Sequence, residues 1–156
     1  MRSGSVGERS SGPFLPSGAR RYVLDSNALV GLFEDRAVIA EKVEQLLRDA
    51  LLRELPLLMS AVNWGDVFYT EWRYRGEAKA RDAEVKVREL PIAFIGVDQD
   101  RATRAAALQQ KHNLGYADAF AAELAIERGA WLVTADPEFS RVGKTLSLYP
   151  LPRHEK

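Results

Sequence analysis

The chain has 156 residues, of which 46% are apolar and 28% charged, the proportions of a single soluble globular domain. Acidic and basic residues number 22 each, so the zero net charge excludes a strongly basic protein that grips nucleic acid by charge alone. The absence of cysteine excludes disulfides, thiolate metal sites and a catalytic thiol. With only two histidines, any metal is expected to have oxygen ligands, which favours Mg²⁺, Mn²⁺ or Ca²⁺.

Residues 1–20 are rich in Ser, Gly and Pro and carry too little apolar surface to fold. We expect a disordered leader there, a folded domain at 21–150 and a tail at 151–156. No apolar run reaches the roughly 20 residues of a membrane-spanning helix, and the N-terminus lacks the apolar stretch of a signal peptide. A cytoplasmic protein with no membrane partner is the default expectation.

Strand-like and helix-like segments alternate from Arg21 onward. Ser60 and Asp98 are expected to cap two of the helices at their start, and Gly129 to end the last one. Strands that are apolar throughout and alternate with helices predict an α/β fold with a parallel sheet covered on both faces. The expected strands are 22–24, 57–59, 92–97, 130–134 and 146–149, and the expected helices are 28–34, 39–51, 61–72, 77–89, 100–111 and 116–128.

Two aspartates stand where such folds form ligand sites, beyond the carboxyl ends of the strands. Asp25 ends the first strand, and Asp136 follows the fourth. A carboxylate at a buried strand end is costly to desolvate unless a cation or hydrogen-bond donors compensate it. A helix cap or a turn would explain either residue equally well, and Asp136-Pro137 suits a turn.

Two further aspartates are predicted on helices. Asp118 lies in the first turn of an alanine-rich helix, where the helix dipole also favours an acid. Asp66 lies two turns into its helix, where the dipole offers less and Asp is a mediocre helix former. Asn63, one turn earlier on the same face, is expected to donate a hydrogen bond to the Asp66 carboxylate.

Converging carboxylates without cations repel one another and tend to take up protons. Mg²⁺ or Mn²⁺ removes this conflict, and two ions roughly 4 Å apart can activate a water and stabilise the leaving oxygen of a phosphodiester. The hydroxyls of Ser26 and Thr134 are candidates for positioning a water, a carboxylate or the phosphate, with routine strand-end hydrogen bonding as the alternative. The candidate catalytic residues and metal ligands are Asp25, Asp66, Asp118 and Asp136.

Three blocks of the sequence resemble the PIN-domain family, particularly the toxin nucleases of VapBC-type toxin–antitoxin systems. They are Tyr22–Leu29, Ser60–Tyr69, and Tyr116–Ala121 together with Leu132–Phe139. The resemblance spans about residues 21–150 and implies a three-layer α/β/α sandwich with a five-stranded parallel sheet. Its implied strand order, 3-2-1-4-5, places the first strand beside the fourth. The family usually has Glu at the second-acid position, where this sequence has Asp66.

The resemblance also implies Mg²⁺- or Mn²⁺-dependent endoribonuclease activity, homodimerisation and inhibition by a small antitoxin that fills a groove beside the site. The alternative is a PIN-like module that binds RNA or a protein without cleaving. A phosphatase with an Asp nucleophile would need a second acid where Asn27 stands. Aromatic and basic residues interleave over 72–81, which is typical of RNA contact or of a solvated helix face. The RNA-binding candidates there are Arg73, Arg75 and Lys79.

Overall fold

The fold is described here by a computed structural model that covers residues 20–153. Five strands form one parallel sheet in the order β4-β3-β2-β5-β6, so the expected sheet and its strand order are confirmed. The third strand is shorter than expected and ends two residues earlier. The strands are β2 (Tyr22–Leu24), β3 (Leu57–Ser60), β4 (Ile92–Ile95), β5 (Trp131–Thr134) and β6 (Ser147–Pro150).

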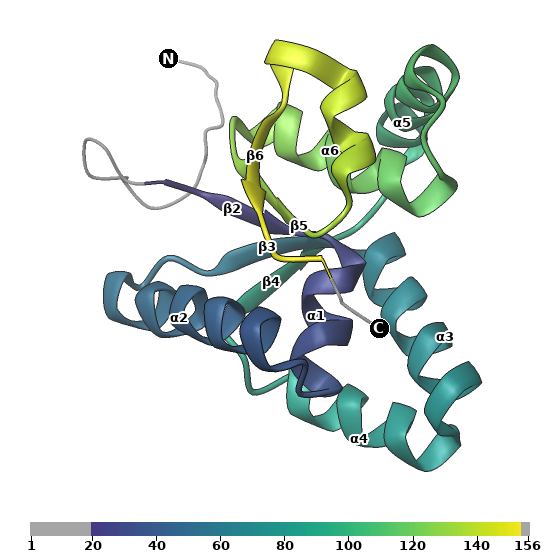
Figure 1. Ribbon diagram of the computed structural model, residues 1–156. Helices are drawn as coiled ribbons and strands as arrows, with labels where there is room; N and C mark the ends of the chain where they lie inside the picture. Colours follow the sequence, from purple (N-terminus) through teal and green to yellow (C-terminus); the bar gives the residue numbers. More distant parts are fainter. Residues whose placement is uncertain (1–19, 154–156) are drawn as a thin grey trace.

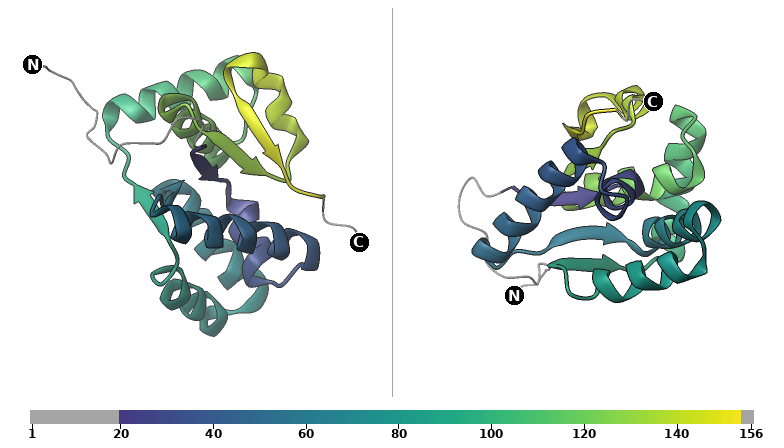
Figure 2. Two further views of the ribbon diagram at one scale, coloured as in Figure 1. Left: turned by 90° about the vertical axis from the view of Figure 1, so that its left-hand side faces the viewer. Right: turned by 60° about the horizontal axis from the view of Figure 1, so that its bottom comes forward.

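Helices cover both faces of this sheet, as expected for three layers. Figure 1 shows α1, α2 and α4 below the sheet and α5 and α6 above it, and the left view of Figure 2 shows the strands between the two helical layers. Within residues 20–153, no helix has the length and apolar character needed to cross a membrane. The helices are α1 (Ser26–Phe33), α2 (Ala37–Arg53), α3 (Ala61–Arg75), α4 (Glu77–Val87), α5 (Gln99–His112), α6 (Tyr116–Arg128) and the 3₁₀ helix η1 (Pro137–Thr145).

Each face of the sheet has its own apolar core, because successive strand residues point to opposite faces. One core joins the sheet to α6, and the other joins it to α1 and α2. Burial on both faces explains why the strands are apolar throughout. The central strand residues are Val23, Leu58 and Leu132 on the α6 face, and Leu24, Met59 and Val133 on the opposite face.

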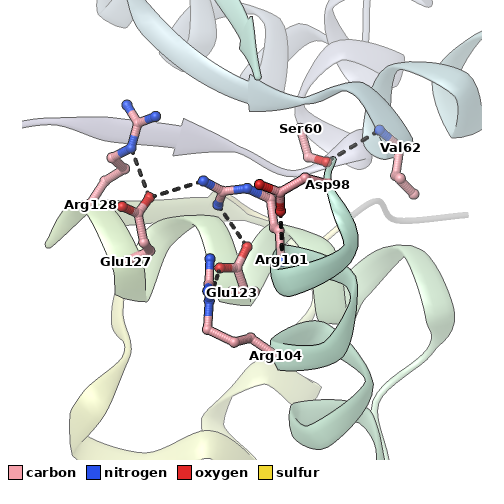
Figure 3. A network of polar contacts seen from close by, with 8 residues as sticks. All are labelled: Ser60, Val62, Asp98, Arg101, Arg104, Glu123, Glu127 and Arg128. Atoms are coloured by element: carbon pink, nitrogen blue, oxygen red, sulfur yellow. Dashed lines mark hydrogen bonds and ion pairs between the residues drawn. The ribbon is translucent and has the colours of Figure 1, made fainter. Parts of the chain in front are cut away.

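The helix ends follow the local signals in the sequence. Ser60 Oγ accepts a 3.2 Å hydrogen bond from the N–H of Val62, and Asp98 Oδ1 accepts a 2.8 Å hydrogen bond from the N–H of Arg101 (Figure 3). Both side chains satisfy backbone donors that have no partner within their own helix. Gly129 ends α6 with a φ of 60°, the left-handed conformation that glycine adopts without strain.

An ion-pair network fastens α5 to α6 (Figure 3). Arg101 Nη1 lies 2.8 Å from Glu123 Oε1, and Arg104 Nε lies 2.9 Å from Glu123 Oε2. Glu123 is only 3% exposed, so both oxygens of a buried carboxylate are paired, as burial of a charge requires. The network holds the helix that carries Asp118 against its neighbour.

The ends of the domain differ slightly from the expected boundaries. Leu151 is buried, and its N–H donates to the carbonyl of Thr134 at 2.7 Å, so it belongs to the fold rather than to the tail. The guanidinium of Arg20 lies over the ring of Trp131, 4.5 Å from the ring centroid. The rest of the expected leader, residues 1–19, and the end of the expected tail, residues 154–156, lie outside the described residues.

Candidate active site

The carboxylate of Asp25 lies at the end of β2, where it also caps α1. Its Oδ1 accepts a 2.8 Å hydrogen bond from the N–H of Ser26. Its Oδ2 accepts from the hydroxyl of Thr134 at 2.8 Å and from Nδ2 of Asn27 at 3.1 Å. Asp25 is 2% exposed, so these three donors compensate part of its desolvation and fix the direction of both oxygens.

Thr134 and Asn27 join the two loops that follow the neighbouring strands β2 and β5. The Thr134 hydroxyl accepts from the N–H of Asp136 at 3.0 Å and from Nδ2 of Asn27 at 3.3 Å. Oδ1 of Asn27 accepts from the N–H of Ala135 at 3.1 Å. Of the three roles expected for the Thr134 hydroxyl, its contacts are those of positioning a carboxylate. Sequence reasoning missed Asn27, although its place two residues after a strand-end acid was a usable signal.

Asp136 caps the start of η1, because its Oδ1 accepts a 2.9 Å hydrogen bond from the N–H of Glu138. Of the two alternatives expected for Asp136, a helix cap and a turn, the structure shows the helix cap. It does not remove the residue from the acid cluster, since the charge of Asp136 raises the pKa of both Asp25 and Asp118. The cap fixes one oxygen of the carboxylate by a backbone donor.

Asp118 lies half-buried in the first turn of α6. Burial raises its pKa most, followed by the charges of Asp136, Asp66 and Glu138, whereas a hydrogen bond from the N–H of Gly115 lowers the pKa. A Cβ at Gly115 would lie only 3.0 Å from Asp118 Oδ2, so the glycine leaves room for the carboxylate. Glu138 was not expected from the sequence as a member of this cluster.

The expected aspartates act on one another's charge. Burial, followed by the charges of Asp118 and Asp136, raises the pKa of Asp25 to about 7. Asp66 is half-buried, and its charge raises the pKa of Asp118, which links it to the cluster. In residues 20–153, however, no three carboxylate or imidazole side chains are arranged as ligands of one metal ion.

The chemistry of this cluster nevertheless fits a divalent cation. All its donors are carboxylate oxygens, which are the ligands that Mg²⁺ and Mn²⁺ prefer. The pKa values of Asp25 and Asp118 are raised by burial and by the repulsion between the acids, and a bound cation would relieve both effects.

The expected contact between Asn63 and Asp66 is wrong. Nδ2 of Asn63 donates instead to Oγ of Ser26 and to the carbonyl of Ala117, each at 3.1 Å. Asn63 is 0% exposed, and a fully buried amide must find its partners in the interior, here on α1 and α6. The Ser26 hydroxyl in turn donates to the main-chain carbonyl of Asn63 at 3.3 Å, so only the Ser26 N–H serves Asp25.

The three RNA-binding candidates differ in their surroundings. Lys79 is exposed, and Arg73 lines an apolar groove of about 570 Å³ along α3. Nη1 of Arg75, by contrast, donates to the carbonyl of Phe33 at 2.9 Å and to Glu71 Oε1 at 3.0 Å, so Arg75 is engaged within the fold and is withdrawn as an RNA contact. The residues that line the groove are Gly65, Phe68, Tyr69, Trp72 and Arg73.

Comparison with known proteins identifies the family, since a family model described as the PIN domain matches residues 22–145. The chain belongs to the PIN-domain family. No curated protein matches it by sequence. Solved structures with the same fold include VapBC complexes and a VapC toxin, and at the identities below their likeness shows the fold alone.

The DNA-bound VapBC from Salmonella typhimurium has a TM-score of 0.66 at 17% identity, over 85% of this chain and 98% of that one. VapC20 from Mycobacterium tuberculosis, a sarcin–ricin loop cleaving toxin, has a TM-score of 0.65 at 15% identity, over 78% and 95%. VapBC-1 from nontypeable Haemophilus influenzae has a TM-score of 0.61 at 23% identity, over 83% and 96%.

Proposed function

We propose that this chain is a Mg²⁺- or Mn²⁺-dependent endoribonuclease and the toxin of a toxin–antitoxin pair. The observation that carries the proposal is the buried carboxylate of Asp25 at the carboxyl end of the central strand, close enough to Asp118 and Asp136 for their charges to raise its pKa. Membership of the PIN-domain family supports nuclease chemistry. RNA as the substrate is supported by the fold likeness to a toxin that cleaves the sarcin–ricin loop.

In this proposal the metal is held by Asp25, Asp118 and Asp136, with Asp66 as a further ligand, directly or through a water. A bound divalent ion would activate a water and stabilise charge on the cleaved phosphodiester. The chain's own residues orient the carboxylates and counter part of the rise in pKa that burial causes. Thr134 supplies a donor that lowers the pKa of Asp25 and fixes the direction of its Oδ2.

Cleavage of RNA by the purified protein tests the enzyme directly. Asp25→Asn and Asp118→Asn are each expected to reduce cleavage under Mn²⁺ by roughly 100-fold or more, because each removes a charge that the metal needs. Asp98→Asn is the matched control, since Asp98 caps α5 and asparagine caps equally well. Absence of both cleavage and Mn²⁺ binding in the wild type would rule out the metal-dependent nuclease.

A PIN-like module that binds RNA or a protein without cleaving is the second candidate. Two observations favour it: no three acids in residues 20–153 are arranged around one ion, and Asp66 stands where the family usually has Glu. Such a module would bind single-stranded RNA with equal affinity in EDTA and in Mn²⁺ and would leave the RNA intact.

We further propose two protein partners, a small antitoxin and a second copy of the chain. Fold likeness to VapBC complexes supports the antitoxin, and the homodimer follows from the family resemblance. Growth arrest on expression, relieved by an antitoxin encoded beside the gene, tests the first partner, and light scattering of the purified protein tests the second. A toxin that cleaves cellular RNA and is held by such an antitoxin acts in the cytoplasm.

We assign RNA contact to the groove on α3 and to the exposed Lys79. Two of the groove's aromatic side chains, Tyr69 and Trp72, are 59% and 42% exposed, and such rings stack unpaired bases at about 1–3 kcal/mol each. Trp72→Ala and Arg73→Ala should weaken binding of a single-stranded RNA in EDTA about tenfold. Leu52→Ala, which truncates an exposed side chain of α2 outside the groove, should not; equal effects of all three variants would contradict the assignment.

A further inference from the structure

We propose that Asn63 is a positioning residue that ties the start of α1 to the start of α6 and thereby sets the placement of Asp25 relative to Asp118. Its side-chain nitrogen donates at 3.1 Å both to Ser26 Oγ and to the carbonyl of Ala117. Ser26 directly follows Asp25, and Ala117 directly precedes Asp118. One buried amide thus contacts the chain neighbours of two proposed metal ligands.

The tie also includes the third helix of the site. Asn63 lies on α3, one turn before Asp66, and α3 packs against both α1 and α6. The hydroxyl of Ser26 returns a hydrogen bond to the main-chain carbonyl of Asn63 at 3.3 Å. Side chain and backbone of Asn63 therefore hold the same neighbour, which restrains the rotation of α1 relative to α3.

The stability of the fold does not by itself explain why a side-chain amide occupies position 63. Asn63 is 0% exposed, and its Oδ1 has no hydrogen-bond partner within residues 20–153, so part of its desolvation is uncompensated. An apolar side chain such as leucine avoids that cost, although it leaves Ser26 Oγ and the carbonyl of Ala117 without this donor, so the two effects on stability oppose each other. What leucine cannot supply is the directional tie between Ser26 and Ala117.

The tie matters for a metal because Mg²⁺ demands near-ideal coordination geometry. Residues that orient ligands without touching the ion typically change metal affinity by about 10–100-fold when replaced. This consequence rests on the proposed metal-dependent function, whereas the positioning of α1 and α6 does not. The two can therefore be measured separately.

The test compares Asn63→Leu and Asn63→Ala with Val43→Ala. Val43 is a fully buried residue of α2 in the core that α1 and α2 share, so its truncation destabilises the fold without removing a polar contact. The metal-free readout is amide hydrogen exchange in EDTA at Ala28 and Ala119, whose N–H groups bond to the carbonyls of Asp25 and Gly115. The metal readout is Mn²⁺ affinity by calorimetry.

We expect Asn63→Leu to lower the melting temperature in EDTA less than Val43→Ala does, and yet to speed exchange at both amides about tenfold. Its Mn²⁺ affinity should fall about 10–100-fold. Val43→Ala should lower the melting temperature and leave Mn²⁺ affinity within about twofold. Ser26→Ala, which removes one partner, should show a smaller effect that is not additive with Asn63→Leu.

Unchanged exchange at Ala28 and Ala119 in Asn63→Leu would overturn the positioning role, whatever the metal data show. Faster exchange with unchanged Mn²⁺ affinity would overturn its consequence for the site. A wild type that binds no Mn²⁺ would refute the proposed metal-dependent function instead, and the exchange data would still decide the role of Asn63.

Discussion

The hydroxyl of Thr134 donates a 2.8 Å hydrogen bond to Oδ2 of Asp25, joining residues 109 positions apart at the ends of the neighbouring strands β5 and β2. This bond lowers the pKa of Asp25 against the burial that raises it. The same hydroxyl accepts from the N–H of Asp136, so one side chain holds the carboxylate of Asp25 and the backbone of Asp136.

Thr134→Val should therefore impair the site more than the fold. Losing the donor should cost about 1–3 kcal/mol of unfolding free energy, since two buried groups lose a partner. Mn²⁺ affinity should fall about 10–100-fold, and the pH of half-maximal Mn²⁺ binding should move upward because Asp25 becomes harder to ionise. Calorimetric titrations at several pH values measure both quantities.

Thr134→Ser provides the control for this prediction, because it restores the hydroxyl and removes only a methyl group. It should recover most of the metal affinity. Equal losses in the serine and valine variants would contradict the prediction, because the hydroxyl that serine retains would then not suffice to support metal binding.

The free energy of unfolding of the metal-free protein should fall as the pH rises. Most carboxyl groups in proteins have the opposite effect, because folding lowers their pKa. The pKa of Asp25 is about 7 in the fold and near 3.8 in the unfolded chain. Between these values the unfolded chain gives up the proton and the fold retains it, so rising pH favours unfolding. Asp25 alone should remove about 1.4 kcal/mol of unfolding free energy per pH unit in this window.

Denaturant unfolding in EDTA at pH 5, 6 and 7 tests this slope, with Asp25→Asn as the reference that lacks the group. The raised pKa of Asp118 acts in the same direction. Added Mn²⁺ should stabilise the wild type more at pH 7 than at pH 5, because metal binding replaces protons. Parallel pH profiles for wild type and Asp25→Asn would contradict the pKa of Asp25.

Asp66→Glu should strengthen the proposed site. The longer side chain restores the residue that the family usually carries, and Asp66 is half-buried on α3. We expect tighter Mn²⁺ binding and faster RNA cleavage, whereas Asp66→Asn should weaken both through loss of the charge that acts on Asp118. Weaker binding in the glutamate variant would show that the site is built around the shorter acid.

The sequence predicts well those parts of the site that depend on local rules. Ser60 and Asp98 cap the starts of helices and Gly129 ends one through their own conformational preferences, so their neighbours along the chain suffice. Asp25 and Asp136 can be assigned to one edge because parallel strands share their carboxyl ends and the family resemblance supplies the strand order.

Local rules do not predict the contacts of a side chain that packs against two other helices. Helical spacing directs Asn63 toward Asp66, but its hydrogen-bond partners are 37 and 54 residues away on α1 and α6. Arg75 belongs by composition to a basic aromatic surface, yet the carbonyl of Phe33 attracts it inward. Contacts to other helices decide both cases, and those contacts depend on which helices the fold brings together.

Gly115→Ala should disturb Asp118 without disturbing the fold. Gly115 has a φ of −65°, which alanine adopts freely, so the backbone is not strained. Its new Cβ would lie 3.0 Å from Asp118 Oδ2, and the short side chain of Asp118 can relieve this contact only by turning its carboxylate away. Mn²⁺ affinity should fall severalfold while the unfolding free energy changes by about 1 kcal/mol or less.

Gly96→Ala is the matched control, because a Cβ at Gly96 meets nothing within 4 Å. Its Mn²⁺ affinity should equal that of the wild type. If Gly115→Ala also binds Mn²⁺ like the wild type, the orientation of Asp118 in the metal-free fold is not the one that serves the metal. The site would then have to rearrange on binding, consistent with the absence, within residues 20–153, of three acids already arranged around one ion.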